Sequence, residues 1–186
     1  DPPGLGKTIQ AIGLANLTGA KRILIICPAS LKDNWAKEWR KWDVNNRSID
    51  LPSAKPRRKQ KNNVVIKSWT EYFWEDADVS IISYDMVVKF FKQTHPPDPW
   101  DFLIIDEAHY LKTDTTARVK NIYGYKGKWV NNPNHSRYEE PLEPIEAKRI
   151  LALTGTPLMS RPIELWTTCK RFDPEGLGRS YHAYTK

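Results

Sequence analysis

Short apolar runs alternate with segments of helical periodicity along most of the chain. The runs are nearly continuous in apolar residues, and they occupy positions 23–27, 64–66, 79–83, 102–106 and 150–154. Continuous runs are typical of strands that are covered on both faces, and helical segments between them indicate crossover connections. The pattern therefore predicts an α/β fold, a parallel sheet with helices on both faces. It leaves the order of the strands open.

Two of the intervening segments have helical periodicity, Thr8–Leu17 and Leu31–Trp42. In the second, apolar residues recur at spacings of four and three and form one stripe, made of Leu31, Trp35, Trp39 and Trp42. We interpret this stripe as a core-facing surface, because apolar stripes on helices usually pack inward. Stacking of these rings on nucleobases is the alternative.

Two further segments, near 43–63 and 121–146, lack a strand or helix period. The first contains a basic run at 53–61, and the second carries Lys126, Lys128 and Arg137 among Gly, Asn, Pro and aromatic residues. We interpret both as solvated surface loops. Contact with a phosphate backbone is an alternative for each, and the basic run also resembles an import signal.

The charge balance allows a polyanionic partner. The 186 residues fit one domain, 27% of them are charged, and the formal net charge is +7. Lys and Arg side chains release counterions from nucleic-acid phosphates, so this charge favours nucleic-acid binding. Simple solubility explains it equally well.

Cysteine and histidine spacings point to no metal centre. Cys27 and Cys169 are far apart, and the four histidines lack zinc-ligand spacing. We expect a reducing, intracellular compartment. No apolar stretch approaches the roughly 20 residues that span a bilayer, so no membrane partner is expected.

The strongest chemical signal is the glycine-rich loop at the start of the chain, Gly4-Leu5-Gly6-Lys7-Thr8. Glycines let backbone N–H groups approach phosphate oxygens, Lys7 can reach the terminal phosphates, and the Thr8 hydroxyl can bind Mg²⁺. A helical pattern begins at Thr8, so the positive end of its dipole would face the phosphates. The loop fits the Walker A pattern, except that Asp1 stands where that pattern has glycine.

Asp106 and Glu107 complete the predicted site. Asp106 ends an apolar run, where a parallel sheet delivers side chains to its ligand-binding edge. Its carboxylate suits Mg²⁺, and Glu107 can orient or activate a water. We therefore predict Mg²⁺-dependent hydrolysis of a nucleotide such as ATP, with Lys7 and Glu107 as catalytic residues. Thr154, Gly155 and Thr156 follow the last strand, and their residue types alone indicate a turn.

Motifs in a characteristic order resemble the SWI/SNF-like ATPases of helicase superfamily two. They are Gly4–Gln10, Cys27–Leu31, Asn34-Trp35, Ile82–Tyr84, Asp106–His109 and Leu153–Pro157. Residues 157–165 are most similar to the annealing-helicase, HARP-like branch and to phage and bacterial relatives. The resemblance covers nearly the whole chain apart from the two loop segments. It implies the first RecA-like lobe of a double-stranded DNA translocase.

The resemblance also assigns roles to residues that chemistry alone does not. His109 and Thr154, Gly155 and Thr156 would couple the nucleotide state to DNA contact. The DNA-tracking strand would lie along a set comprising Pro28, Ala29, Ser30, Ser83 and Tyr84. Such contacts read the phosphate backbone, so little sequence preference is expected. The location would be the nucleus in a eukaryote, or the cytoplasm or nucleoid for a bacterial or phage protein.

The departures from the family pattern set further expectations. Pro2-Pro3 replaces the usual Glu-Met before the glycine loop. We expect residues 1–186 to be a first lobe that is incomplete at its N-terminus, without the second RecA-like lobe and its arginine finger. An arginine finger contributes about 10³–10⁵ in rate, so we expect ATP binding with poor turnover.

Three other functions fit parts of the sequence. A strand-separating helicase of the same superfamily shares most of the motifs. A catalytically weak, nucleic-acid-binding scaffold fits the charge without requiring hydrolysis. A small P-loop kinase is disfavoured, because no segment suggests a lid that would bind a phosphate acceptor.

Overall fold

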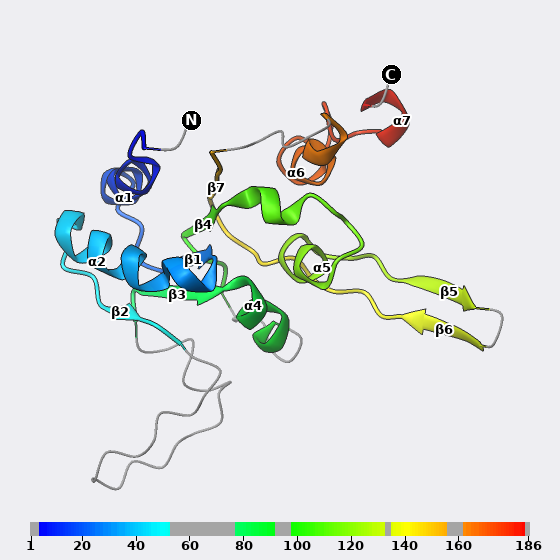
Figure 1. Ribbon diagram of the computed structural model, residues 1–186, viewed down its shortest axis with the longest axis horizontal. Helices are drawn as coiled ribbons and strands as arrows, with labels where there is room; N and C mark the ends of the chain where they lie inside the picture. Colours follow the sequence, from blue (N-terminus) through cyan, green and yellow to red (C-terminus); the bar gives the residue numbers. More distant parts are fainter. Residues whose placement is uncertain (1–3, 53–76, 92–97, 133–134, 156–161, 185–186) are drawn as a thin grey trace, which may run out of the picture. The chain divides into compact units, whose positions relative to one another are not determined.

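The computed structural model describes residues 4–52, 77–91, 98–132, 135–155 and 162–184 (Figure 1). The chain folds into two compact units. The first comprises Asp1–Ala108 and Glu146–Gly155, and the second comprises His109–Ile145 and Thr156–Lys186. Among the described residues, no helix combines the length and apolar character needed to cross a bilayer.

The first unit is built on a parallel sheet of five strands. In sheet order they are β2 (Ile49–Asp50), β3 (Val79–Ser83), β1 (Ile23–Cys27), β4 (Phe102–Asp106) and β7 (Ile150–Leu153). Every neighbouring pair is parallel, with Ile25 aligned to Ile81 on one side and Ile104 on the other. The predicted α/β class and parallel sheet are confirmed. The predicted run at 64–66 lies outside the described residues.

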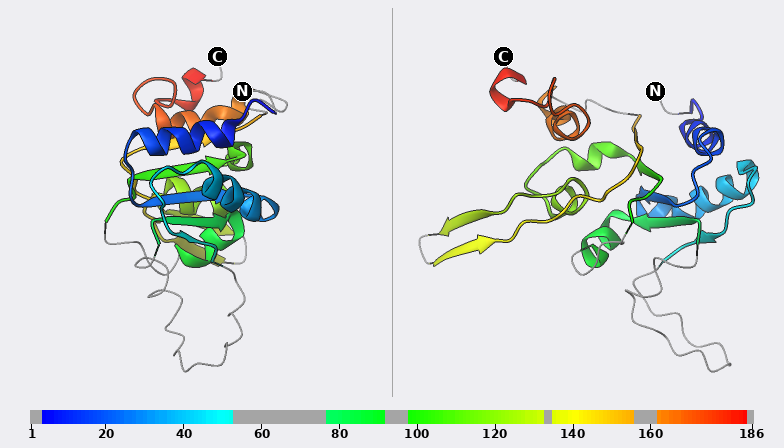
Figure 2. Two further views of the ribbon diagram at one scale, coloured as in Figure 1. Left: turned by 90° about the vertical axis from the view of Figure 1, so that its left-hand side faces the viewer. Right: turned by 180° about the vertical axis from the view of Figure 1, so that it is seen from behind.

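Helices cover both faces of this sheet, as predicted. Helices α1 (Lys7–Leu17) and α2 (Lys32–Trp42) lie in front of it in the left view of Figure 2. Their apolar side chains pack on one set of alternate strand residues, including Ile23, Ile25 and Cys27. Helix α4 (Tyr84–Phe90) contacts β1 and β3 and lies on the opposite face.

The tryptophan stripe is core-facing in its middle and exposed at its end. Trp35 and Trp39 are buried in the cluster beneath α2, and Leu31 packs against that cluster. Trp42, in contrast, is 40% exposed, and its indole Nε1 donates to Glu38 at 2.9 Å. The predicted helix also begins differently, since residues 29–31 form a 3-10 turn, η1 (Ala29–Leu31), before α2.

The second unit contains short helices and an antiparallel hairpin. Its elements are α5 (Ala117–Tyr123), β5 (Lys128–Asn132), β6 (His135–Glu139), η3 (Pro162–Leu165), α6 (Trp166–Phe172) and α7 (Tyr181–Tyr184). The turn η2 (Ala108–Leu111) leads into it from β4, and the Thr167 hydroxyl donates to the Leu111 carbonyl at 2.5 Å. The segment near 121–146 is predicted from sequence as a solvated loop, but within it β5 (Lys128–Asn132) and β6 (His135–Glu139) pair as an antiparallel hairpin. This polar segment has no hydrophobic periodicity, so its strands cannot be recognised from the sequence; they form because cross-strand hydrogen bonds pair them.

Candidate nucleotide-binding site

The glycine loop has the backbone conformation that a phosphate-binding turn requires. Gly4 and Gly6 have φ angles of 87° and 71°, in the left-handed region that favours glycine. Gly6 caps α1, and the Gln10 amide N–H bonds its carbonyl at 3.0 Å. The first N–H groups of a helix have no partner within it, so those of α1 are available to an anion. Residues 1–3 lie outside the described residues.

A side chain from α1 ties this loop to the helix. The Gln10 Nε2 atom donates to the Leu5 carbonyl at 2.8 Å. Lys7 and Thr8 are half-buried in the first turn, whereas Gly4 and Leu5 are exposed. The loop is therefore held from its own helix while its outer surface stays open. Sequence reasoning gave Gln10 no role, although its position three residues after Lys7 places it on that turn.

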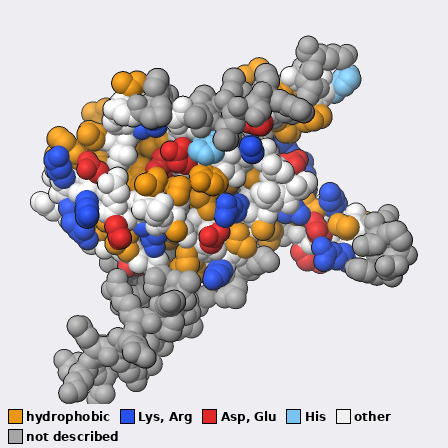
Figure 3. All heavy atoms as spheres, in the orientation of Figure 1, with side chains coloured by type: hydrophobic (Ala, Val, Ile, Leu, Met, Phe, Trp, Pro, Cys, Tyr) orange, Lys and Arg blue, Asp and Glu red, His pale blue; other side chains and the backbone are white. Residues whose placement is uncertain are grey.

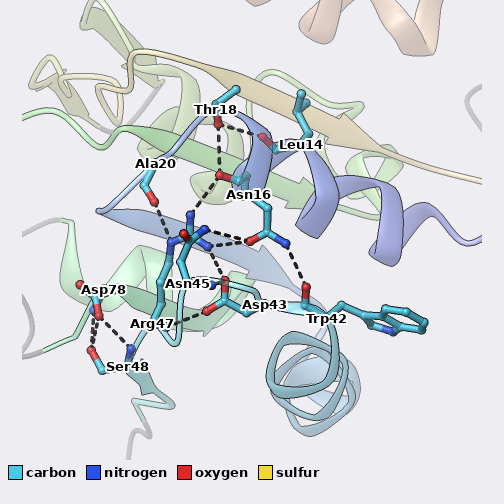
Figure 4. A network of polar contacts seen from close by, with 11 residues as sticks. Leu14, Asn16, Thr18, Ala20, Trp42, Asp43, Asn45, Arg47, Ser48 and Asp78 are labelled. Carbon is cyan, nitrogen blue, oxygen red and sulfur yellow. Dashed lines mark hydrogen bonds and ion pairs between the residues drawn. The ribbon is translucent and has the colours of Figure 1, made fainter.

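The other end of α1 is fixed by Arg47, in the segment that leads to β2 (Figure 4). Arg47 Nη2 donates to the Ala15 carbonyl at 3.1 Å, and Nε donates to the Ala20 carbonyl at 2.8 Å. Its Nη1 atom bonds Asn16 Oδ1 at 2.9 Å and Asp43 Oδ1 at 2.5 Å. The positive charge at the Ala15 carbonyl, in the last turn of α1, complements the helix dipole. The network holds the phosphate-facing helix against the sheet.

Asp106 stands at the carboxyl end of β4, as predicted, and is only 8% exposed. Both its carboxylate oxygens accept a hydrogen bond. The Trp35 indole Nε1 donates to Oδ2 at 2.7 Å, and the Glu107 amide N–H donates to Oδ1 at 3.0 Å. These two donors orient the carboxylate. Each oxygen still has a second lone pair, so the group keeps acceptor capacity.

The ionisation of Asp106 depends on opposing influences. Burial raises the pKa of Asp106 above the usual carboxyl range, and the neighbouring Glu107 charge acts in the same sense. The Trp35 hydrogen bond and the positive charge of Lys7 lower the pKa. The positive charge of Lys7, on the glycine loop, therefore favours the ionised form of the carboxylate at the end of β4.

Glu107 adopts a strained backbone conformation next to this carboxylate. Its φ angle is 52°, one of two left-handed non-glycine residues among those described. The Tyr84 hydroxyl donates to the Asp106 carbonyl at 2.6 Å and lies 3.4 Å from the Glu107 carbonyl. Such strain persists only where the surroundings determine it, and it is frequent at functional sites.

The donor set fits Mg²⁺ better than a transition metal. Within the described residues, no group of three or more His, Cys, Asp or Glu side chains could hold a metal ion. Mg²⁺ in nucleotide sites uses one or two carboxylates, with substrate phosphates and water supplying the remaining oxygens. The carboxylate of Asp106 fits that requirement, and the Thr8 hydroxyl stays a predicted second ligand.

The residues expected to contact DNA are distributed among three elements of the first unit. Pro28 follows β1, and Ala29 and Ser30 are exposed in η1. Ser83 ends β3 and Tyr84 begins α4, and they are 6% and 3% exposed. DNA contact by these five residues stays a prediction. The hydrogen bonds of Tyr84 also give this residue a structural role, because they stabilise the turn from β4 into Glu107.

The residues expected to couple nucleotide and DNA are only partly described. Leu153 is aligned with Asp106 across β7 and β4, so Thr154 and Gly155 follow at the same sheet edge as Glu107. Thr156 lies outside the described residues. His109 belongs to the second unit, where its ring stacks on Tyr110 with centroids 4.8 Å apart. Their coupling role stays a prediction.

Comparisons with known proteins point to one family. The SNF2-related domain family matches residues 1–130. A bovine SWI/SNF-related matrix-associated actin-dependent regulator of chromatin subfamily A-like protein 1 is 36% identical over 168 residues, covering 90% of this chain and 14% of that protein. The yeast ISWI chromatin-remodeling complex ATPase ISW2 is 31% identical, covering 97% of this chain and 14% of its own length.

A solved structure shares the fold. The Sulfolobus solfataricus SWI2/SNF2 ATPase core in complex with dsDNA has a TM-score of 0.69 and 23% sequence identity. The alignment covers 100% of this chain and 32% of that one. The chain therefore spans about a third of this ATPase core, and 14% of each of the two curated relatives described above.

Proposed function

The chain belongs to the SNF2-related domain family, and on that premise we propose that it forms the ATP-binding part of an ATP-dependent double-stranded DNA translocase. The observation that carries this proposal is the buried Asp106 carboxylate at the end of β4, oriented by Trp35 and by the Glu107 amide, together with the left-handed glycine loop that begins α1. A phosphate-binding cation and a metal-binding carboxylate are the two parts that nucleotide hydrolysis requires in one place.

We propose a separate role in hydrolysis for each of these residues. The α1 N-terminus and Lys7 bind the phosphates, and Thr8 and Asp106 hold Mg²⁺. Bound Mg²⁺ would neutralise charge on the phosphate oxygens. Trp35 keeps the Asp106 carboxylate oriented, and the left-handed turn at Glu107 holds the second carboxylate at the sheet edge, to orient the attacking water and accept its proton.

Double-stranded DNA is the proposed partner. The relatives are named as chromatin regulators and remodelling ATPases, and the solved SWI2/SNF2 core is in complex with dsDNA. The net charge of +7 is compatible with contacts to a phosphate backbone. We propose that Pro28, Ala29 and Ser30 contact the tracking strand, together with Ser83 and Tyr84. His109 and residues 154–156 would link these contacts to the nucleotide.

Two further proposals follow from the family. Turnover by the 186 residues alone is slow, because the family resemblance places an arginine finger in a second RecA-like lobe. The protein acts inside the cell, in the nucleus of a eukaryote, or in the cytoplasm or nucleoid of a bacterium or phage-infected host. A strand-separating helicase and a weakly catalytic scaffold remain the competing functions.

The test is ATP turnover by the complete protein with and without duplex DNA. We expect duplex DNA to raise kcat, Lys7→Ala to abolish nucleotide binding, and Lys21→Ala to change neither, because Lys21 is an exposed lysine distant from the loop in sequence. Equal turnover with and without DNA would contradict translocation. Retained nucleotide binding and DNA affinity in Lys7→Ala would favour the scaffold, and directional unwinding of tailed duplexes would favour the helicase.

A further inference from the structure

The hairpin β5–β6 presents two aromatic rings to solvent. Its antiparallel register aligns Trp129 with Tyr138, so both side chains lie on one face of the ribbon. The ring centroids are 5.5 Å apart with an interplanar angle of 54°. Trp129 is 68% exposed, one of the larger exposures of apolar side chains that the structure describes, and Tyr138 is 44% exposed. Tryptophan and tyrosine are enriched among the residues that contribute most to binding at interfaces, so this exposed pair is a candidate binding site.

The base of the hairpin is firmly fixed within its own unit. Tyr125 and Leu142 exchange two backbone hydrogen bonds, of 2.7 and 2.8 Å. From α5, Lys120 reaches Glu139 Oε2 at 2.6 Å, and the Tyr125 hydroxyl donates to the same oxygen at 3.0 Å. The Lys120 ammonium also lies 4.2 Å from the Tyr125 ring centroid. These contacts hold the base of the hairpin, and therefore the strands that carry Trp129 and Tyr138, in a defined position within the second unit.

Gly127 adds a steric constraint at the same place. Its φ angle is 76°, and a Cβ there would lie 2.8 Å from both the Glu139 carbonyl and the Tyr138 hydroxyl. The chain therefore passes directly beside Tyr138, and only glycine permits this approach. The position of the Tyr138 ring is defined from the backbone as well as from Trp129.

Basic side chains outnumber acidic ones around the two rings, and one of them, Arg137, also pairs with Glu139 at 3.3 Å. Lys128 directly precedes Trp129, Arg137 directly precedes Tyr138, and Lys126 lies just before them, all three exposed. The Lys120 hydrogen bond lowers the pKa of Glu139, so this carboxylate stays ionised and its charge is balanced by its partners. Within the described residues, no ion pair involves Lys126 or Lys128. Figure 3 shows basic, acidic and apolar side chains together at the right of the view, where this hairpin lies.

We propose that Trp129 and Tyr138 bind unpaired bases of a nucleic-acid strand, with Lys128 and Arg137 on its phosphates. This rests on the proposed function, which makes DNA the partner. Aromatic rings stack on any base, but in a duplex both faces of each base are already covered. Lys128 and Arg137 lie on the opposite face of the hairpin from the two rings. Among the described residues, no second layer packs on that face of the two-stranded ribbon, so their long side chains can extend around its edge to the phosphates of a nucleic-acid strand whose bases stack on the rings. The hairpin therefore selects DNA with an unpaired arm.

The experiment measures the affinity of the complete protein for two labelled DNAs, a blunt duplex and the same duplex with an unpaired oligo-dT arm. We expect Trp129→Ala/Tyr138→Ala to weaken binding of the arm-bearing DNA about 5-fold or more and to leave blunt-duplex affinity unchanged. Trp129→Phe/Tyr138→Phe keeps both rings and should keep the preference. Trp42→Ala is the matched control, an exposed tryptophan with Lys41 above its ring at 4.8 Å.

Two additional measurements keep the outcome decisive even where the alanine variant alters the hairpin. In wild-type protein, 5-iododeoxyuridine in the unpaired arm should photocrosslink to Trp129 or Tyr138, and crosslinks elsewhere only would overturn the proposal. Lys128→Gln/Arg137→Gln should reduce the salt dependence of arm binding by about one to two ions, whereas the alanine variant should not.

The remaining outcomes are separable from failure of the proposed function. An equal loss on both DNAs, or no loss, overturns the hairpin proposal even when duplex DNA stimulates ATP turnover. A loss of self-association in light scattering, without a change in DNA affinity, would assign the rings to a second copy of the chain. Arm-selective binding without DNA-stimulated turnover would overturn the translocase and leave the hairpin site standing.

Discussion

The indole Nε1 of Trp35 donates a 2.7 Å hydrogen bond to Asp106 Oδ2. Trp35 lies in α2 and Asp106 at the end of β4, 71 residues later, and both are almost fully buried. The bond ties the packing of α2 to the ionisation of the proposed metal-binding carboxylate. A tryptophan that the stripe assigns to the core is thereby also a positioning residue for the site.

Trp35→Phe keeps most of the packing and removes the N–H donor. Because that hydrogen bond lowers the pKa of Asp106, its loss should raise the pKa further. Asp106 must be ionised to hold Mg²⁺, and activity falls as pH drops through its pKa. The acidic limb of the kcat/KM profile for ATP turnover should therefore move to higher pH. An unshifted profile would contradict this role.

Trp39→Phe is the matched control for that experiment. Trp39 lies one turn further along α2 and is also buried, but its Nε1 has no hydrogen-bond partner within the described residues. The packing change is similar and no bond to Asp106 is lost. We expect the pH profile of Trp39→Phe to match that of the wild type.

The buried pair Arg47–Asp43 should be important for stability. Their side chains are 6% and 3% exposed, so Arg47→Met leaves a buried carboxylate without its main partner. Chemical denaturation should show a loss of about 3–5 kcal/mol for this variant. Arg47→Met/Asp43→Asn should lose less than the sum of the two single variants. Lys148→Met breaks an ion pair whose lysine is 60% exposed and should cost at most about 1 kcal/mol.

The two cysteines should differ in reactivity. Burial, together with the Asp106 charge, raises the pKa of Cys27 to about 12. At pH 8 only about one Cys27 thiol in 10⁴ would be ionised, and the thiolate is the reactive form. Cys169 is half-buried. Peptide mass spectrometry after maleimide treatment should find Cys169 modified first and Cys27 modified only in denaturant, whereas equal native rates would show that Cys27 is accessible.

The sequence predicts the sheet better than the contacts that organise the site. Strands at 23–27, 79–83 and 102–106 are recognisable because buried parallel strands need continuous apolar runs, and Asp106 is recognisable because an acid ends one of them. β2 has only two residues, Ile49 and Asp50, in a polar stretch, so it carries no period. The direction of the Trp35 N–H depends on how α2 packs against β4, which no local pattern encodes.

Arg47 and the hairpin illustrate the same limit. Arg47 sits among polar residues and is indistinguishable in sequence from a solvated cation, yet its guanidinium is buried against the Ala15 carbonyl of α1 and the Ala20 carbonyl that follows the helix. In the hairpin, the alignment of Trp129 with Tyr138 is set by cross-strand pairing and by the bonds of Glu139. Both depend on residues that are distant in sequence.

Glu107 allows backbone and side-chain effects to be separated. Its φ of 52° suits glycine, so Glu107→Gly should stabilise the fold by about 1 kcal/mol and lower ATP turnover at least about 10²-fold. Glu107→Gln keeps the strain and removes the carboxylate, so it should lose turnover without gaining stability. Thermal melts and turnover assays on both variants check this, and full activity in either one would contradict the role of Glu107.

The left-handed turn at Glu107 also has a consequence for laboratory evolution. A library screened only for heat resistance would enrich glycine at position 107, because the least strained residue is favoured there. Those clones would fold better and would be expected to lose hydrolysis. Selection for thermostability alone would therefore select against ATP hydrolysis, unless each round also scored nucleotide turnover.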